Sequence, residues 1–132
     1  MKHTVYFKAA QNMNLLGDNT IDIVVTSPPY PMIEMWDEIM SSQNYEIKKA
    51  FEENKPRQAF ELMHQELDKV WTECWRVLKE GAFLCINIGD ATRTIAGEFA
   101  LYNNNTRIIQ ACEKLGFTNL PNILWKKTTN AP

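Results

Sequence analysis

The sequence predicts an α/β fold in which a mostly parallel sheet carries helices on both faces. Apolar runs of strand length alternate along the chain with segments of helical period. These runs contain few polar positions, which is typical of parallel strands buried on both faces. The composition, with 45% hydrophobic and 23% charged residues, is that of an ordinary globular protein. The length of 132 residues fits a single domain or part of one.

The first half of the chain contains two expected strands. Residues 3–7 are a short strand candidate, and residues 9–19 carry apolar side chains at helical spacing before a Gly-Asp-Asn turn. The run Ile-Asp-Ile-Val-Val-Thr at 21–26 predicts a buried strand. This strand must end at the double proline that follows, because proline has no N–H group for a neighbouring strand. Residues 32–40 predict a short helix or an ordered loop.

The strongest helical pattern lies in the second half. Residues 41–58 are polar and charged and predict a surface excursion, whereas residues 59–79 carry apolar side chains at i, i+3, i+4 and i+7. The second segment predicts a long helix with Trp71 and Trp75 in the core. Gly81 is placed to end that helix.

Four further segments complete the expected order. They are a buried strand over 82–88, a loop over 91–105, a helix over 106–115 that ends at Gly116, and a fourth strand over 122–127. Strands that alternate with helices imply a parallel sheet with crossover helices. The carboxyl ends of such strands share one edge of the sheet, and ligands of these folds bind there.

Two polar turns are expected at that edge, Ser27-Pro28-Pro29-Tyr30 and Gly89-Asp90. A double proline gives a rigid turn that presents carbonyl oxygens without competing N–H donors. Ser27 adds a side-chain acceptor and Tyr30 adds a flat aromatic face, so the first turn suits a planar ring that carries an amino group. The alternatives for this turn are a polyproline II ligand based on Pro28-x-x-Pro31 and a purely structural turn.

The sequence Thr-Ser-Pro-Pro-Tyr after an apolar strand resembles motif IV of the S-adenosylmethionine-dependent amino-methyltransferases of DNA. Three longer blocks are similar, in the same order, to the catalytic half of site-specific DNA methylases: SPPYPMIEMWDE, VWTECWRVLKEGAFLCINIGDATRT and GFTNLPNILWKKTTNAP. The resemblance implies a partial Rossmann-like methyltransferase sheet. It also implies methyl transfer to the exocyclic amine of a flipped base, as in restriction-modification. Serine in first place favours cytosine N4; adenine N6 and a non-catalytic methyltransferase-like subunit are the alternatives.

The resemblance also implies roles for individual residues. In motif IV, Ser27 Oγ and the Pro28 carbonyl accept the two hydrogens of the amine, Pro29 completes the rigid turn, and Tyr30 stacks on the base. Methyl transfer would then be a direct in-line displacement without a covalent enzyme intermediate. Further candidates are Trp36, Asp37 and Trp125 for substrate binding, and Gly89 and Asp90 at the cofactor pocket. Packing is an equal alternative for Trp36 and Trp125.

The cofactor loop of such methylases is not in this sequence. That loop has the form Phe-x-Gly-x-Gly, and no two of the five glycines are separated by one residue. We therefore expect residues 1–132 to form a single, incomplete catalytic domain that is inactive alone and lacks the cofactor-loop half. The expected cofactor is S-adenosylmethionine, bound at an incomplete site. The expected partners are DNA and a complementary C-terminal half, a second subunit or a second copy of the chain, since the partial sheet leaves an unpaired strand edge.

Composition limits the remaining classes of function. The net charge of −2 places most DNA-binding charge elsewhere. The three cysteines form no C-x-x-C pair, so we expect that they are small buried hydrophobic residues and that they do not form a metal site. No apolar run approaches the roughly 20 residues that span a bilayer, and no signal region is found, so we expect a cytoplasmic protein with no membrane partner. His3 and His64 receive no role. Four cations have two possible roles, contact with DNA phosphates or a solvated surface position: Arg93, Arg107, Lys126 and Lys127.

Overall fold

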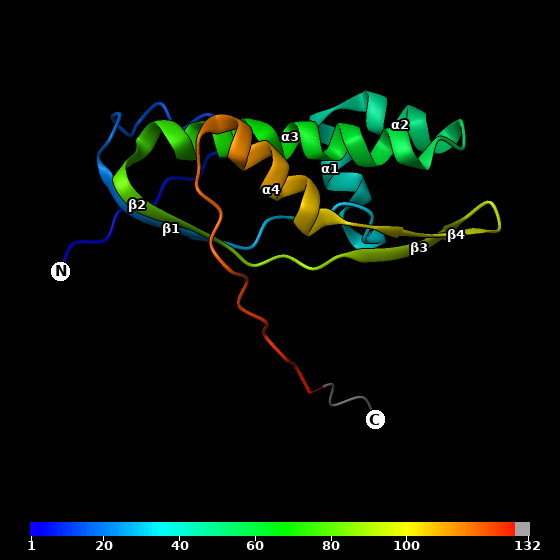
Figure 1. Cartoon of the computed structure of the whole chain (residues 1–132). Helices are drawn as coiled ribbons and strands as arrows, with labels where there is room; N and C mark the ends of the chain where they lie inside the picture. The colour runs from blue at the N-terminus through cyan, green and yellow to red at the C-terminus, as the bar shows by residue number, and fades with distance from the viewer. Residues whose placement is uncertain (129–132) are drawn as a thin grey trace.

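The computed structural model, which describes residues 1–128, confirms the α/β fold class (Figure 1). Strand β1 (Ile21–Thr26) and strand β2 (Leu78–Ile86) form a parallel pair. Helix α3 (Pro56–Val77) leads directly into β2 and lies over the pair, so the connection between the two strands contains the expected crossover helix.

The remaining elements extend the structure beyond the parallel pair. Between β1 and α3 lie three short helices: η1 (Glu34–Trp36), α1 (Asp37–Gln43) and α2 (Tyr45–Glu52). After β2 follow an antiparallel hairpin and one more helix: β3 (Ala91–Ile95), β4 (Glu98–Tyr102) and α4 (Asn104–Leu115). Figure 1 shows α4 beside α3, with the hairpin projecting past the carboxyl ends of β1 and β2.

Gly81 lies in a bulge of the parallel pair rather than at the end of a helix. Helix α3 gives way to extended backbone at Leu78, where φ is −70° and ψ is 138°. Ile21 pairs with Leu78 but Ile23 pairs with Phe83, so β2 contains extra residues between these two pairs. Gly81 has a φ of +76° within the bulge, a conformation that favours glycine. The expectation that Gly81 ends the helix is therefore wrong.

The core lies where α3 meets the strands and α4. Helix α3 begins with Pro56 in its first turn, where the missing N–H group breaks no helical hydrogen bond. Trp71 is fully buried, as predicted, whereas Trp75 is 46% exposed. Trp75 packs edge-on against Phe117, with ring centroids 4.9 Å apart. The other members of the buried cluster come from most elements: Met32, Met40, Ile47, Met63, Leu67, Cys74, Leu78, Ala91, Tyr102, Ile108 and Cys112.

One face of the parallel pair is apolar and uncovered in the described part of the chain. We call it the open face; it consists of Ile23, Val25, Phe83 and Cys85. Val25 is 75% exposed and Phe83 is 55% exposed. The alternate side chains, such as Val24 and Leu84, pack against the core. The expectations that β1 is buried on both faces and that all cysteines are buried are therefore wrong within residues 1–128.

Three predicted elements do not form in residues 1–128. Residues 3–7 and 122–127 are not strands, and residues 9–19 contain only turns. An isolated strand is unstable because its N–H and C=O groups need a neighbouring strand, and neither segment pairs with one. The last four residues of the sequence, which end the third block of resemblance, lie outside the described residues.

Two segments predicted to be irregular are ordered. Helix α2 lies inside the expected excursion; its N-cap Asn44 accepts a hydrogen bond from Glu46 N at 3.0 Å. The hairpin replaces most of the expected loop over 91–105. Its two turn residues, Ala96 and Gly97, have φ values of 51° and 82°, as a type I′ turn requires.

Candidate functional site

The two polar turns meet at one edge of the parallel pair, as the sequence predicts. Thr26 pairs with Ile86 at the carboxyl ends of both strands. Asn87 N donates to Thr26 O at 2.9 Å and extends the pairing by one residue. Asn87 Nδ2 lies 3.5 Å from Ser27 Oγ, at the long limit for a hydrogen bond. The chain therefore leaves both strands side by side, and we call this edge the rim.

The first turn has an exposed Ser27, and the residues that follow Ser27 are anchored in the structure. Pro28 is buried and Tyr30 is half-buried. Ile33 N donates to Tyr30 O at 3.2 Å, and Met32 between them has a φ of 69°. Proline in second place and a positive φ in third place are typical of a type II turn. A positive φ is unfavourable for methionine, and burial of the Met32 side chain, which is 1% exposed, offsets that cost.

Gly89 brings the second turn against the aromatic ring of the first. A Cβ atom at Gly89 would lie 3.5 Å from Tyr30 Cε2, so the ring lies against backbone. The ring is thus supported on one side and half-exposed overall. This geometry places Gly89 beside the proposed stacking residue; its role at a cofactor pocket stays a prediction.

Asp90 is engaged at the start of helix α4. Its Oδ1 accepts from Asn105 N at 3.0 Å, and its Oδ2 accepts from Asn103 Nδ2 at 3.4 Å. A carboxylate at a helix N-terminus is stabilised by the unpaired N–H groups there. Asp90 is also exposed, so a further contact with a ligand is sterically open.

Asp37 forms an ion pair with Arg93, which lies far from it in the sequence. Arg93 donates to both carboxylate oxygens of Asp37, at 2.9 and 2.6 Å, and lies over the Phe51 ring at 4.8 Å from its centroid. The hydrogen bond from Arg93 to Asp37 raises the pKa of the Arg93 guanidinium. Both residues line an open pocket beside α1 and α2, and Trp36 is half-buried next to Asp37 in the chain. Arg93 is therefore part of an ion pair rather than a free surface charge.

Trp125 lies in the irregular segment after α4. Its side chain is 69% exposed, and Lys127 Nζ lies 4.7 Å from the ring centroid. Figure 1 shows this segment leaving the body of the molecule. The structure thus does not pack Trp125 into the core, and its contact with a base stays a prediction.

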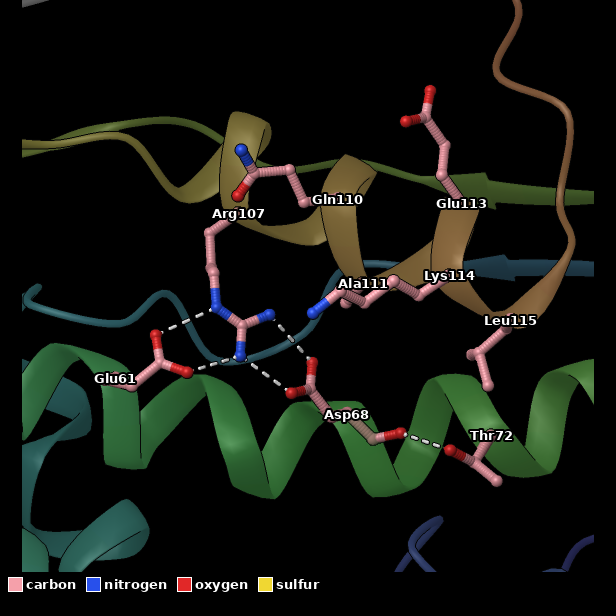
Figure 2. Close-up of a pocket in the computed structure, with 9 residues that line it drawn as sticks. All are labelled: Glu61, Asp68, Thr72, Arg107, Gln110, Ala111, Glu113, Lys114 and Leu115. Atoms are coloured by element: carbon pink, nitrogen blue, oxygen red, sulfur yellow. Dashed lines mark hydrogen bonds and ion pairs between the residues drawn. The ribbon is translucent and has the colours of Figure 1, made fainter.

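Arg107 binds two carboxylates of α3 (Figure 2). It donates to both oxygens of Glu61, at 3.0 and 2.8 Å, and to both of Asp68, at 3.2 and 2.8 Å. Its hydrogen bonds lower the pKa of the Glu61 carboxyl. The groove between α3 and α4 in Figure 2 therefore presents a neutralised guanidinium, which makes it a poor phosphate site.

Behind the rim lies a buried polar pair, Asn104 and His64, that the sequence does not mark as functional. Asn104 Nδ2 donates to Pro31 O at 3.0 Å and to Gly89 O at 3.1 Å, and His64 Nε2 lies 2.9 Å from Asn104 Oδ1. Both side chains are fully buried. A sequence signal existed for His64, which occupies a core position four residues after Phe60 in the apolar pattern of α3. Asn104 likewise lies four residues before Ile108 in the apolar pattern of α4, but as the second of three consecutive asparagines it does not stand out.

His64 makes stability depend on pH. Burial lowers its pKa from 6.5 to about 4 because it disfavours the imidazolium. Between these values the unfolded chain binds a proton that the native chain does not, so the free energy of unfolding falls as pH falls. From pH 7 to pH 5 we expect a loss of roughly 2 kcal/mol in urea unfolding. His64→Gln should flatten this dependence and the exposed His3→Gln should not; equal slopes in wild type and His64→Gln would contradict the assignment.

Two features are not found in residues 1–128. No helix in this range is long and apolar enough to cross a membrane. No group of three or more His, Cys, Asp or Glu side chains in the same range is arranged to hold a metal ion.

Comparison with known proteins gives consistent matches. A family model described as DNA methylase, of the N6/N4 type, matches residues 21–132. The chain is 49% identical to the type II methyltransferase M.MjaI of Methanocaldococcus jannaschii and 46% identical to M.MthZI of Methanothermobacter thermautotrophicus, each over 98% of this chain. It spans 46% and 37% of the lengths of these two relatives.

Solved structures agree with the sequence relatives. A putative DNA modification methylase from Thermus thermophilus, in complex with S-adenosyl-L-methionine, matches with a TM-score of 0.67 and 30% identity. The match covers 92% of this chain and 44% of that one. Another structure of the same protein matches with a TM-score of 0.60 and 28% identity, over 84% of this chain and 39% of that one.

Proposed function

The chain belongs to the N6/N4 family of S-adenosylmethionine-dependent DNA methylases, and we propose that it forms the base-binding part of a site-specific DNA methyltransferase. Methyl transfer would go to the exocyclic amine of a base flipped out of the duplex, with cytosine N4 as the target. The observation that carries this proposal is the rigid turn from Ser27 to Tyr30, placed at the carboxyl ends of two parallel strands with its ring against Gly89.

The turn can hold an amino group for attack. The amine of a base is a poor nucleophile because its lone pair is delocalised into the ring. Ser27 Oγ and the Pro28 carbonyl accept hydrogen bonds from its two N–H groups. These hydrogen bonds favour a more tetrahedral nitrogen whose lone pair points out of the ring plane. Tyr30 fixes the ring by stacking, worth about 1–3 kcal/mol for a base on an aromatic side chain. Positioning of this kind can supply much of the rate acceleration.

The residues present form only one side of a cofactor site. S-adenosylmethionine, when bound, supplies a methyl group on a positively charged sulfur. Gly89 and Asp90 lie at the rim where the cofactor pocket would border the base, but no glycine-rich loop is among the residues of this chain. We therefore place most of the cofactor contacts in the part of the methylase fold that lies outside the matched segment.

A cysteine nucleophile is not part of the proposal. Burial raises the pKa of Cys74 to about 11 and that of Cys112 to about 12, so neither forms a thiolate at neutral pH. Cys85 is exposed but lies on the open face, where it pairs with Val25 in β1. Direct transfer from cofactor to amine needs no covalent intermediate with the protein.

The arginines of this chain are poorly placed to bind DNA phosphates. All four arginines of the sequence have internal partners. Arg57 donates to Leu101 O at 3.3 Å and Arg76 pairs with Asp18 at 2.7 Å; the other two, Arg93 and Arg107, pair with carboxylates as described above. With a net charge of −2, the electrostatic part of DNA binding must come largely from a second segment.

We propose that this second segment covers the open face. Family members that match the chain over 98% of its length are more than twice as long, so the fold has a further part. Apolar side chains such as Val25 and Phe83 suit a packed partner, and parallel sheets are normally covered on both sides. The covering segment can belong to the same polypeptide, to a separate subunit or to a second copy of the chain.

A chimaera tests the proposed function. When this chain replaces the matched segment of M.MjaI, we expect methyl transfer from radiolabelled S-adenosylmethionine to DNA. Residues 1–132 alone should transfer no methyl group above background. Mass spectrometry of the digested DNA then separates 4-methylcytosine from 6-methyladenine. A chimaera that folds and binds S-adenosylmethionine but transfers no methyl group would instead favour the non-catalytic subunit.

A further inference from the structure

We infer that Asn104 and His64 act together as positioning residues that hold Tyr30 and the adjoining amine acceptors in the geometry needed for methyl transfer. This inference rests on the proposed function. Neither side chain touches the space in front of the Ser27–Tyr30 turn; both lie behind it, fully buried. We call the two residues the rim clamp.

Asn104 ties the two turns of the rim together. Its amide nitrogen has two hydrogens, and each meets a backbone carbonyl from a different turn: Pro31 O at 3.0 Å and Gly89 O at 3.1 Å. The Tyr30 ring lies against Gly89, so the side chain that joins the two backbones also fixes the ring on its support. Without it, the buried Pro31 carbonyl and the part-buried Gly89 carbonyl would lose this partner, and a buried carbonyl without a partner costs about 1–3 kcal/mol.

The bond to Pro31 O also selects the conformation of the turn. The peptide between Pro31 and Met32 has opposite orientations in type I and type II turns. Asn104 Nδ2 can donate to Pro31 O only when the Pro31 carbonyl points inward. This orientation of the peptide requires the positive φ of 69° at Met32. If this peptide flips, the Pro31 carbonyl turns away from Asn104, and the link from the turn that carries Tyr30 to Gly89 is lost. The rim clamp thus acts on the catalytic turn through its backbone.

His64 in turn orients Asn104. Because both Asn104 hydrogens are used on carbonyls, its Oδ1 must accept, and His64 must donate from Nε2. His64 Nδ1 is then a buried lone pair, and in the described residues it has no hydrogen-bond partner. A side chain chosen only for packing would carry no such unpaired atom, so the donor at Nε2 is the feature that explains histidine at this position.

Three variants of the rim clamp distinguish positioning from packing. Asn104→Leu removes all three hydrogen bonds while keeping the number and branching of side-chain heavy atoms, and His64→Leu removes the donor. His64→Gln restores a donor near the Nε2 position. The exposed Asn14→Leu and His3→Leu are matched controls, since neither side chain contacts the rim.

The first measurement is kinetic, in the chimaera with M.MjaI. We expect Asn104→Leu and His64→Leu to lower kcat by about tenfold to a hundredfold, because a misplacement of about 1 Å can cost that much. The KM for DNA should change by less than about threefold, since phosphate contacts lie elsewhere. His64→Gln should recover kcat to within about threefold of wild type. A wild-type kcat in both leucine variants, or no recovery in His64→Gln, would overturn the inference.

The second measurement does not need activity. In the chain alone, the nuclear Overhauser effect between Gly89 Hα and the Tyr30 ring reports their contact. It should be strong in wild type and His64→Gln and weak in the leucine variants of the clamp. If the chimaera is inactive but this pattern holds, the proposed function fails while the clamp stands. An unchanged contact in both leucine variants removes the clamp. If Asn104→Leu does not fold, the His64 pair alone decides.

Discussion

Replacing Tyr30 by alanine in the chimaera is expected to lower methyl transfer by roughly tenfold to a hundredfold. Stacking of a base on an aromatic ring is worth about 1–3 kcal/mol, and 1.36 kcal/mol corresponds to about a factor of ten in rate. The ring lies against Gly89, which has no side chain that could stack on the base in its place. Single-turnover rates with radiolabelled S-adenosylmethionine measure the effect on the chemical step.

Two further variants separate stacking from stability. Tyr30→Phe keeps the aromatic face and should retain most of the rate, and Tyr6→Ala removes an exposed tyrosine outside the rim as a matched control. Ser27→Ala should also lower the rate strongly, because it removes an acceptor for the amine while the buried Pro28 keeps the turn in place. Wild-type turnover in both Tyr30→Ala and Ser27→Ala, with the fold intact, would remove the proposed roles of the turn.

The elements that the sequence predicts well are those whose stability is encoded locally. Helix α3 has an apolar side chain at nearly every third or fourth position, and the strand β1 is bounded by a double proline. The rim could also be predicted, because parallel strands bring their carboxyl ends together regardless of the rest of the sheet. Residues 27–30 and 89–90 therefore meet as expected.

Other elements depend on partners that local patterns do not reveal. Residues 122–127 are apolar enough for a strand, but within residues 1–128 no neighbouring strand pairs with them. The sequence does not predict the hairpin, because its type I′ turn uses Ala96-Gly97 rather than the usual Asn-Gly or Asp-Gly. The rim clamp arises only where α3 and α4 meet, which joins residues 40 positions apart. Periodicity along one segment carries no information about such a contact.

The open face predicts a very small effect of one substitution in the chain alone and a large effect in the chimaera. In the chain alone, Val25→Lys should change the free energy of unfolding by less than about 0.5 kcal/mol, since Val25 is 75% exposed there. In the chimaera, the covering segment would bury the new ammonium group without a partner. That costs several kcal/mol, so we expect the chimaera to lose folding or tight packing of its two parts.

Cys85 provides the measurement because it lies on the same face as Val25 and is the exposed cysteine. Its reaction with a thiol reagent should be fast in the chain alone and at least about tenfold slower in the wild-type chimaera, where local opening limits access. Val25→Lys should restore fast labelling in the chimaera. Gln110→Lys, on the exposed side of α4, adds the same charge and should leave Cys85 protected. Equal labelling rates of Cys85 in the chain and the folded wild-type chimaera would show that the family fold leaves this face open, and the surface would then need another partner.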